Sequence, residues 1–160
     1  NQFKFLISLK MQSKLLVFPL ILINFFIFSY QKKILTEELT WKVRESKTIR
    51  LEISDNFHKR KIGLMNREFL EKNKGMIFIY DNLEPVNIWM YKTFIPLDII
   101  FLKKNKITKI TPNAKPCLDL PCKLYPSSEP VDMVIEINAG QAKILNLKVG
   151  DDLIFLKNKI

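Results

Sequence analysis

The sequence predicts a predominantly β domain with two short helices, preceded by a separate apolar segment at the N-terminus. Beyond residue 30, short runs rich in Ile, Val, Phe, Tyr and Trp recur, with turn-forming residues between them. Only two stretches of that region carry helix signals, and both are short. The 160 residues are enough for one domain and a terminal appendage.

The apolar segment spans residues 15–30 and follows Lys14. It is shorter than the ~20 residues that span a bilayer and better fits the apolar region of a signal peptide. No small-residue cleavage site follows it, and two lysines at 32–33 weaken the charge asymmetry that favours export. We expect residues 1–30 to be an export signal or an uncleaved membrane anchor, with Met11 as one option for the natural start. The domain would then lie in the periplasm or on the outer face of the cytoplasmic membrane.

The chain is basic, with a formal net charge of +10 at pH 7. A basic domain can indicate a nucleic acid, an anionic lipid or an acidic polymer as partner. Here the lysines are scattered in pairs such as 103–104, and neither a basic helix stripe nor an alternation of aromatic and basic residues is present. Nucleic-acid binding is therefore not expected.

The domain begins with a linker or first strand region at 31–46, followed by a single β-rich unit over 47–160. "KTIRLEIS" (47–54) alternates polar and apolar residues, which predicts a half-buried strand. The residues expected to face the core are Ile49, Leu51 and Ile53.

A short helix is predicted over "NFHKRKIGLM" (56–65). Ser54 and Asp55 can cap its N-terminus, and Gly63 lies near its end. The residues expected on one side of this helix are Phe57, Ile62 and Met65.

Runs of β-branched and aromatic residues predict three consecutive strands, "GMIFIY" (75–80), "VNIWMY" (86–91) and "LDIIFL" (97–102). Pro96 marks a bend between the last two, because it forces Ile95 out of the helical region. "KKNK" around Asn105 predicts a hairpin turn, since Asn tolerates left-handed conformations. Trp89 and Met90 are both expected in the core, and Trp41 over an edge.

The C-terminal part continues the pattern. A loop with four prolines crosses from "ITKIT" (107–111) to a strand in "VDMVIEI" (131–137). "AGQAKILNLK" (139–148) predicts the second short helix, and "LIFLK" (153–157) the last strand.

Five ordered motifs resemble a bacterial and archaeal family named domain of unknown function 192. They are "GLMNRE" (63–68), "GMIF" (75–78), "WMYKTFIPLDIIF" (89–101), "YPSSEPVDMVIEINAG" (125–140) and "VGDDL" (149–153). Together they cover about residues 45–157. The resemblance implies a compact β-sandwich or barrel like a jelly roll, often behind a signal sequence, and implies no particular activity.

This chain departs from the family at Lys92, where the family commonly has Asn before the residue that is Thr93 here. An amide donates and accepts hydrogen bonds, whereas the lysine ammonium only donates. If the family's amide binds a ligand, the resemblance implies that the ligand preference has changed in this protein.

Two carboxylates, Asp98 and Glu136, lie within apolar strands. A buried carboxylate without a partner costs several kcal/mol or takes up a proton. We predict that Arg67 pairs with Asp98, with Thr93 or backbone N–H groups as alternatives. The favoured interpretation is that such residues tie loops to the sheet, and the other is a polar cluster that contacts a ligand. The ligand-binding candidates are Arg67, Trp89, Lys92, Thr93, Asp98, Glu136 and Asn138.

Cys117 and Cys122 are the only cysteines and lie in the proline-rich loop. In an oxidising compartment they are expected to form a disulfide. Their spacing differs from that of a redox C-x-x-C motif, and two thiols alone make a poor metal site. The single histidine, His58, lies among basic residues on an exposed helix face, so neither a metal site nor a cofactor is predicted.

These features favour a small envelope-located β-sandwich module that binds a ligand or an envelope component without catalysing a reaction. One alternative is a hydrolase that acts on a polymer such as a glycan, with Asp98 and Glu136 as its carboxylates. Another is a structural accessory of envelope assembly. In each case the N-terminal segment would contact the membrane.

Overall fold

The computed structural model describes residues 38–44 and 47–157, so the predicted signal or anchor at 1–30 lies outside the described residues. Among the described helices, none is both long enough and apolar enough to cross a membrane. The elements, in chain order, are β1 (Glu38–Arg44), β2 (Lys47–Ser54), α2 (Phe57–Ile62), β3 (Lys74–Glu84), β4 (Asn87–Trp89), β5 (Leu97–Lys103), β6 (Lys106–Ala114), β7 (Leu124–Pro126), β8 (Val131–Asn138), α3 (Gln141–Ile144) and β9 (Ile154–Lys157).

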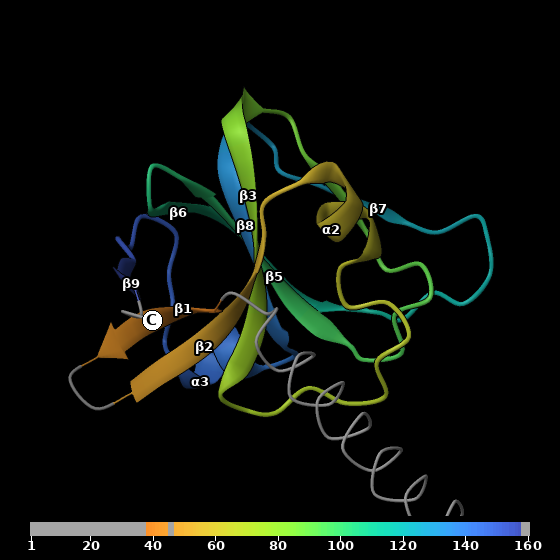
Figure 1. Cartoon of the computed structure of the whole chain (residues 1–160), viewed down its shortest axis with the longest axis horizontal. Helices are drawn as coiled ribbons and strands as arrows, with labels where there is room; N and C mark the ends of the chain where they lie inside the picture. The colour runs from red at the N-terminus through yellow and green to blue at the C-terminus, as the bar shows by residue number, and fades with distance from the viewer. Residues whose placement is uncertain (1–37, 45–46, 158–160) are drawn as a thin grey trace, which may run out of the picture. The chain divides into compact units, whose positions relative to one another are not determined.

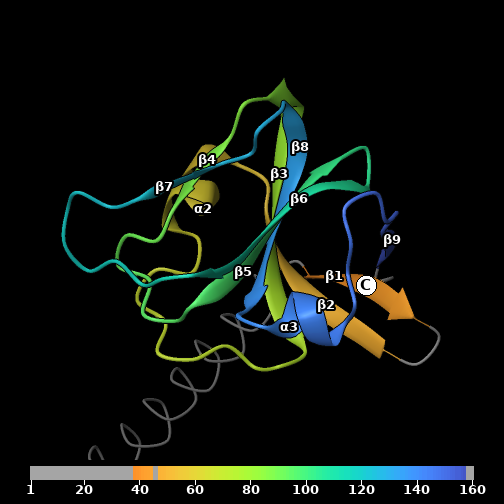
Figure 2. The ribbon, with the colours of Figure 1, turned by 180° about the vertical axis from the view of Figure 1, so that it is seen from behind.

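Seven strands form one sheet in the order β6-β5-β8-β3-β2-β1-β9 (Figure 1), and β4 pairs with β7 in a second, small sheet (Figure 2). Only the β2–β3 pair is parallel among the described strand pairs. Figure 2 shows α3 and the small sheet with α2 in separate parts of the domain. The predicted mainly β, sandwich-like fold with two short helices is confirmed, although the described strands do not close into a barrel.

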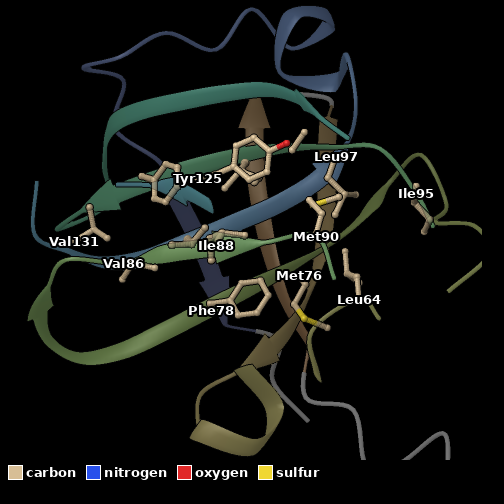
Figure 3. Close-up of a cluster of buried hydrophobic side chains, with 14 of the residues drawn as sticks. Leu64, Met76, Phe78, Val86, Ile88, Met90, Ile95, Leu97, Tyr125 and Val131 are labelled. Atoms are coloured by element: carbon tan, nitrogen blue, oxygen red, sulfur yellow. The ribbon is translucent and has the colours of Figure 1, made fainter. Parts of the chain in front are cut away.

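The centre of the large sheet is buried on both faces. On one face, side chains such as Phe78, Ile99 and Val134 pack with Ile88 and Tyr125 of the small sheet (Figure 3). The other face forms a second core, in which α3 and β1 take part. Its members include Trp41, Leu51, Ile77, Ile100, Ile135 and Leu145. Buried residues therefore run continuously along Leu97–Leu102 of β5 and 134–137 of β8, without the alternation of a strand that faces water on one side.

The N-terminal part of the domain has a strand in the region expected to be a linker or first strand, and it corrects the expected place of Trp41. The region 31–46 contributes a strand, β1, which lies between β2 and β9. Trp41 on this strand is fully buried in the second core, so its expected place over an edge was wrong. The reason is the outer strand β9, which pairs with β1 and extends the sheet beyond it.

The helix α2 also differs from its prediction. Asn56 caps it, because its side-chain oxygen accepts the Lys59 N–H at 2.9 Å, whereas the Ser54 side chain is buried. Phe57 is 76% exposed and Ile62 is also exposed, so no residue of α2 is buried. The apolar residues expected on one side of this helix therefore do not form a buried face.

Two local predictions are confirmed. Lys104 and Asn105 have φ of 49° and 66° and form the two-residue turn between β5 and β6. Cys117 and Cys122 form a disulfide, with their Cα atoms 5.9 Å apart. In the tryptophan motif, Met90 is buried as expected, but Trp89 is 38% exposed because it lies on the outer side of the small sheet.

Asp98 is fully buried and binds backbone N–H groups, so its predicted pairing with Arg67 is wrong. Its Oδ1 accepts the N–H of Asn113 and its Oδ2 accepts the N–H of Ala142, both at 2.9 Å. The strand β6 has a bulge opposite Asp98. At this bulge the Asn113 N–H takes no part in the hydrogen bonds between the strands, and Pro112 has no backbone N–H. Gly140 at the N-cap of α3 has no side chain that could cap the helix.

One carboxylate thus joins β5, the bulge in β6 and the first turn of α3. Asp98→Ala should lower the free energy of unfolding by about 3 kcal/mol, because it leaves the buried Ala142 N–H and the part-buried Asn113 N–H without an acceptor. Asp132→Ala is the control, since Asp132 also accepts a backbone N–H, that of Lys104, but at an exposed site. The control should lose less than about 1 kcal/mol, as measured by urea denaturation. Equal losses would contradict the role given to Asp98.

Candidate functional site

A pocket of about 80 Å³ lies where α2, β3, β4 and β8 meet. Its floor includes Glu136 of β8 and Thr93, and its wall includes Tyr80 of β3. Arg60 of α2 and Trp89 of β4 stand nearer the surface, since the structure leaves both side chains partly exposed. The pocket therefore combines a buried carboxyl, two hydroxyls, a guanidinium and an indole ring.

Glu136 occupies the middle of the large sheet. The register places it between Met76 of β3 and Ile99 of β5, on the face that the small sheet covers. It is 4% exposed, and within the described part of the chain its carboxyl has no hydrogen-bond or charge partner. Burial raises the pKa of Glu136 to about 8. At neutral pH the side chain is therefore mostly protonated, and it can both donate and accept a hydrogen bond.

Tyr80 and Arg60 form the side of the pocket next to Glu136. The Arg60 guanidinium carbon lies 4.8 Å from the centre of the Tyr80 ring, and its Nη1 donates to the carbonyl of Ile79 at 2.7 Å. Burial raises the pKa of Tyr80 to about 12, with the Arg60 charge opposing and the Glu84 and Glu136 charges adding. The phenol is therefore neutral, and it is close enough to the Glu136 carboxyl for the two to influence each other.

Two turns bring the remaining pocket residues into place. Gly63 ends α2 with φ of 49°, where any Cβ would lie 3.2 Å from the Phe78 ring, and the chain then buries Leu64. A second turn follows β4, in which the Thr93 N–H donates to the Met90 carbonyl at 3.0 Å. This turn directs the buried Thr93 to the pocket.

The conformation of Lys92 gives a backbone reason for the asparagine that the resemblance implies at this position. Lys92 has φ of 52° and its side chain is exposed, with Nζ 5.3 Å from the centre of the Tyr91 ring. Asparagine tolerates such a left-handed conformation better than most residues. The two turns are tied together here, because the Asn66 N–H donates to the Lys92 carbonyl at 2.8 Å. A preference for Asn at this position therefore does not require a ligand.

The structure brings only some of the sequence-predicted site residues together. Trp89, Thr93 and Glu136 line the pocket. Asp98 does not, because Glu136 pairs with the neighbouring Ile99, so the side chains of Asp98 and Glu136 point to opposite faces of the sheet. A site that uses both carboxylates is not formed.

Arg67 and Asn138 have structural partners outside the pocket. Arg67 makes two hydrogen bonds of 2.6 Å with the Glu52 carboxylate, and this pairing raises the pKa of Arg67. The side-chain amide of Asn138 donates to the carbonyl of Leu70 at 2.9 Å, which holds the loop after α2 against β8. Both residues therefore support the loop that borders the pocket.

Sequence reasoning missed Arg60, Tyr80 and Asn87, which also line the pocket. Tyr80 lies two residues after Phe78 in the same strand, so strand alternation could have placed it on the Phe78 face. Arg60 belongs to a helix that was expected to be an ordinary solvated surface. Nothing local in the sequence distinguishes it from the neighbouring lysines.

Comparison with known proteins gives consistent results. A model of the family DUF192, described as "Uncharacterized ACR", matches residues 39–155. None of the curated proteins matches the sequence. A protein from Sinorhizobium meliloti 1021, described as a candidate transcription regulator, is 32% identical, with a TM-score of 0.66; the match covers 75% of this chain and 93% of that one. A protein of unknown function from Novosphingobium aromaticivorans DSM 12444 is also 32% identical, with a TM-score of 0.63, over 73% of this chain and 83% of that one.

The raised pKa of Glu136 predicts a pH dependence of folding. The folded protein keeps this proton up to about pH 8, whereas the unfolded chain loses it near the ordinary value of 4.5. Between these values the unfolded state binds fewer protons, so stability falls as the pH rises, by up to about 1.4 kcal/mol per pH unit. Glu136→Gln should remove this contribution, which urea denaturation from about pH 5 to about pH 8 measures.

The control is Glu68→Gln, which neutralises an exposed glutamate. It should keep the pH dependence of the wild type. A Glu136→Gln profile as steep as that of the wild type would show that Glu136 is ionised in the folded protein at neutral pH.

Proposed function

The chain belongs to the DUF192 family, and we propose that it is a small ligand-binding module of the cell envelope that does not catalyse a reaction. The observation that carries this proposal is Glu136, a buried carboxyl without a protein partner among the described residues, at the floor of a pocket. A buried polar group without a partner costs free energy, and a ligand that forms hydrogen bonds with it removes that cost.

The positions of the carboxyl groups support binding over hydrolysis. A glycosidase needs two carboxyl groups on either side of one bond, about 5 to 10 Å apart across the same cleft. Asp98 lies on the other face of the sheet from Glu136, and backbone N–H groups occupy both of its oxygens. Glu136 is also mostly protonated at neutral pH, so it is a better hydrogen-bond donor to a ligand than a general base.

An envelope location is proposed from two features. The apolar run at 15–30 has the length and preceding charge of a signal peptide or short anchor. The Cys117–Cys122 disulfide is compatible with an oxidising compartment. The exposed lysines are scattered among acidic residues, as in the pairs Lys103–Glu129 and Lys106–Asp152, so nucleic acid is not proposed as the partner.

A structural role in envelope assembly is the second candidate. One observation favours it, namely the large apolar side chains exposed on α2, on the small sheet and on the loops next to them. They are Phe57, Ile62, Phe69, Trp89, Phe94, Leu118, Leu120 and Leu124. Side chains of this kind, where they are contiguous, are typical of surfaces that contact another protein or a membrane.

A thermal-shift screen of the full chain against glycans, nucleotides and small organic ions tests ligand binding. A ligand at about 100 times its Kd adds about 2.7 kcal/mol to stability and raises Tm by several degrees. Asn87→Trp, which should fill the pocket mouth, is expected to abolish the shift; Asn82→Trp, at an exposed position outside the pocket lining, is expected to retain it. A ligand that stabilises both variants equally binds elsewhere, and the absence of any hit would contradict the proposal.

The envelope location predicts that residues 11–40 direct export of a fused reporter that is active only outside the cytoplasm. In the same cells the full chain should carry the Cys117–Cys122 disulfide. Thiol titration of the denatured protein without reductant should then detect almost no free thiol. A reporter that stays in the cytoplasm, together with two free thiols per chain, would refute the envelope location.

A further inference from the structure

The pocket presents hydrogen-bond donors and positive charge. Arg60 uses Nη1 for the Ile79 carbonyl, and within the described ranges neither Arg60 nor Lys61 forms an ion pair, although both line the pocket. The Tyr80 hydroxyl adds a further donor nearby, whereas the Thr93 hydroxyl donates to the Tyr91 carbonyl at 3.4 Å. A ligand group that fits this wall must supply acceptors and negative charge.

The floor of the pocket places a second requirement on the ligand group. The Glu136 carboxyl lies between the side chains of Met76 and Ile99, which offer it no hydrogen bond. In its neutral form it donates one O–H, and the preferred acceptor in a place of low dielectric is a charged oxygen. Two carboxyl groups that share one proton in this way are a known arrangement in buried sites.

We propose that the pocket binds the carboxylate group of a small organic acid, an inference that rests on the proposed ligand-binding function. One carboxylate oxygen accepts the O–H of Glu136, and the other lies toward Arg60, with Lys61 at the pocket mouth. The group enters as the anion and leaves as the anion, so no bond other than hydrogen bonds forms or breaks.

The size of the pocket agrees with a group of a few atoms. Its volume of about 80 Å³ is small beside the several hundred Å³ that enclose a drug-sized ligand. A carboxylate with one or two carbons fits this space, and a sugar ring does not. The rest of a larger acid would lie outside the pocket, against Trp89, whose ring centre is 5.3 Å from that of Tyr91.

Binding should depend on pH through Glu136. The titratable and charged groups that face it are Tyr80 from β3 and the two cations of α2, whereas β4 and β5 present Ile88 and Ile99. Glu52 of β2 lies next to Met76 across the sheet, on the side away from Glu136. Its charge is neutralised by Arg67. Above about pH 8 the Glu136 carboxylate and the bound carboxylate repel, so affinity should fall by about tenfold per pH unit.

Acetate is the probe, titrated into the ¹⁵N-labelled full chain up to about 100 mM and followed by amide chemical shifts, which detect millimolar Kd values. Acetamide is the neutral control of the same shape, and inorganic phosphate is a control anion. Acetate should shift the amides of Gly63 and Thr93, and acetamide should not. Arg60→Met should weaken acetate binding about tenfold, whereas Lys59→Met, on the same helix but paired with Asp55, should change it less than about twofold.

The Glu136→Gln variant tests separately the hydrogen-bond donor that neutral Glu136 provides and the negative charge that it acquires at high pH. Its neutral amide can still donate, so acetate binding should persist near pH 7 but lose the fall above about pH 8 that the wild type shows. Equal binding of acetamide, or tighter binding of phosphate in the same pocket, would overturn the carboxylate inference and leave the ligand-binding function standing. If no probe shifts a pocket amide, the carboxylate inference is refuted, and the thermal-shift screen with Asn87→Trp decides the wider function separately.

Discussion

The burial of β3, β8 and β5 on both faces constrains everything else in this domain. Six consecutive residues of β5, Leu97–Leu102, are fully buried, because one core lies above the sheet and another below it. At the centre of these strands a polar side chain is removed from bulk water whichever way it points, whereas the end of β3 is exposed. Such a side chain must find a protein partner, become neutral or face an internal space. Asp98 and Glu136, on adjacent strands and opposite faces, satisfy this constraint in two different ways.

Asp98 satisfies the constraint with partners. A bulge, a proline without an N–H and a glycine at the start of α3 leave two backbone donors next to it, and it accepts both. Glu136 satisfies the constraint by holding its proton and facing the pocket. The difference follows from what covers each face. The second core is closed over Asp98 by α3, whereas the small sheet and α2 leave a gap over Glu136.

The loops that border this pocket are held in place by contacts between residues that do not face the ligand. The Arg67–Glu52 pair and the amide of Asn138 hold the loop after α2, and the Asn66–Lys92 backbone hydrogen bond joins this loop to the turn that carries Thr93. The disulfide loop reaches the same turn, because the Lys92 N–H donates to the Cys117 carbonyl at 2.8 Å. The pocket is therefore supported from three separate segments of the chain, which limits how far its residues can move apart.

The sequence by itself determined most of the strands, the hairpin turn at Asn105 and the mainly β class, because runs of β-branched residues and turn preferences act over a few neighbouring residues. It missed the strand β7, which lies in the proline-rich stretch that was predicted as a loop. The sequence also identified Glu136 and Thr93 as candidate site residues. A carboxyl or hydroxyl within an apolar run is unusual, because burying it without a partner costs free energy. The tertiary structure alone decided which partners these residues have. Arg67 pairs with Glu52 and not Asp98, and Arg60 of an exposed helix borders the pocket, because strand register and a bulge set these distances. Register joins residues far apart in the chain, and no local pattern of residues specifies it.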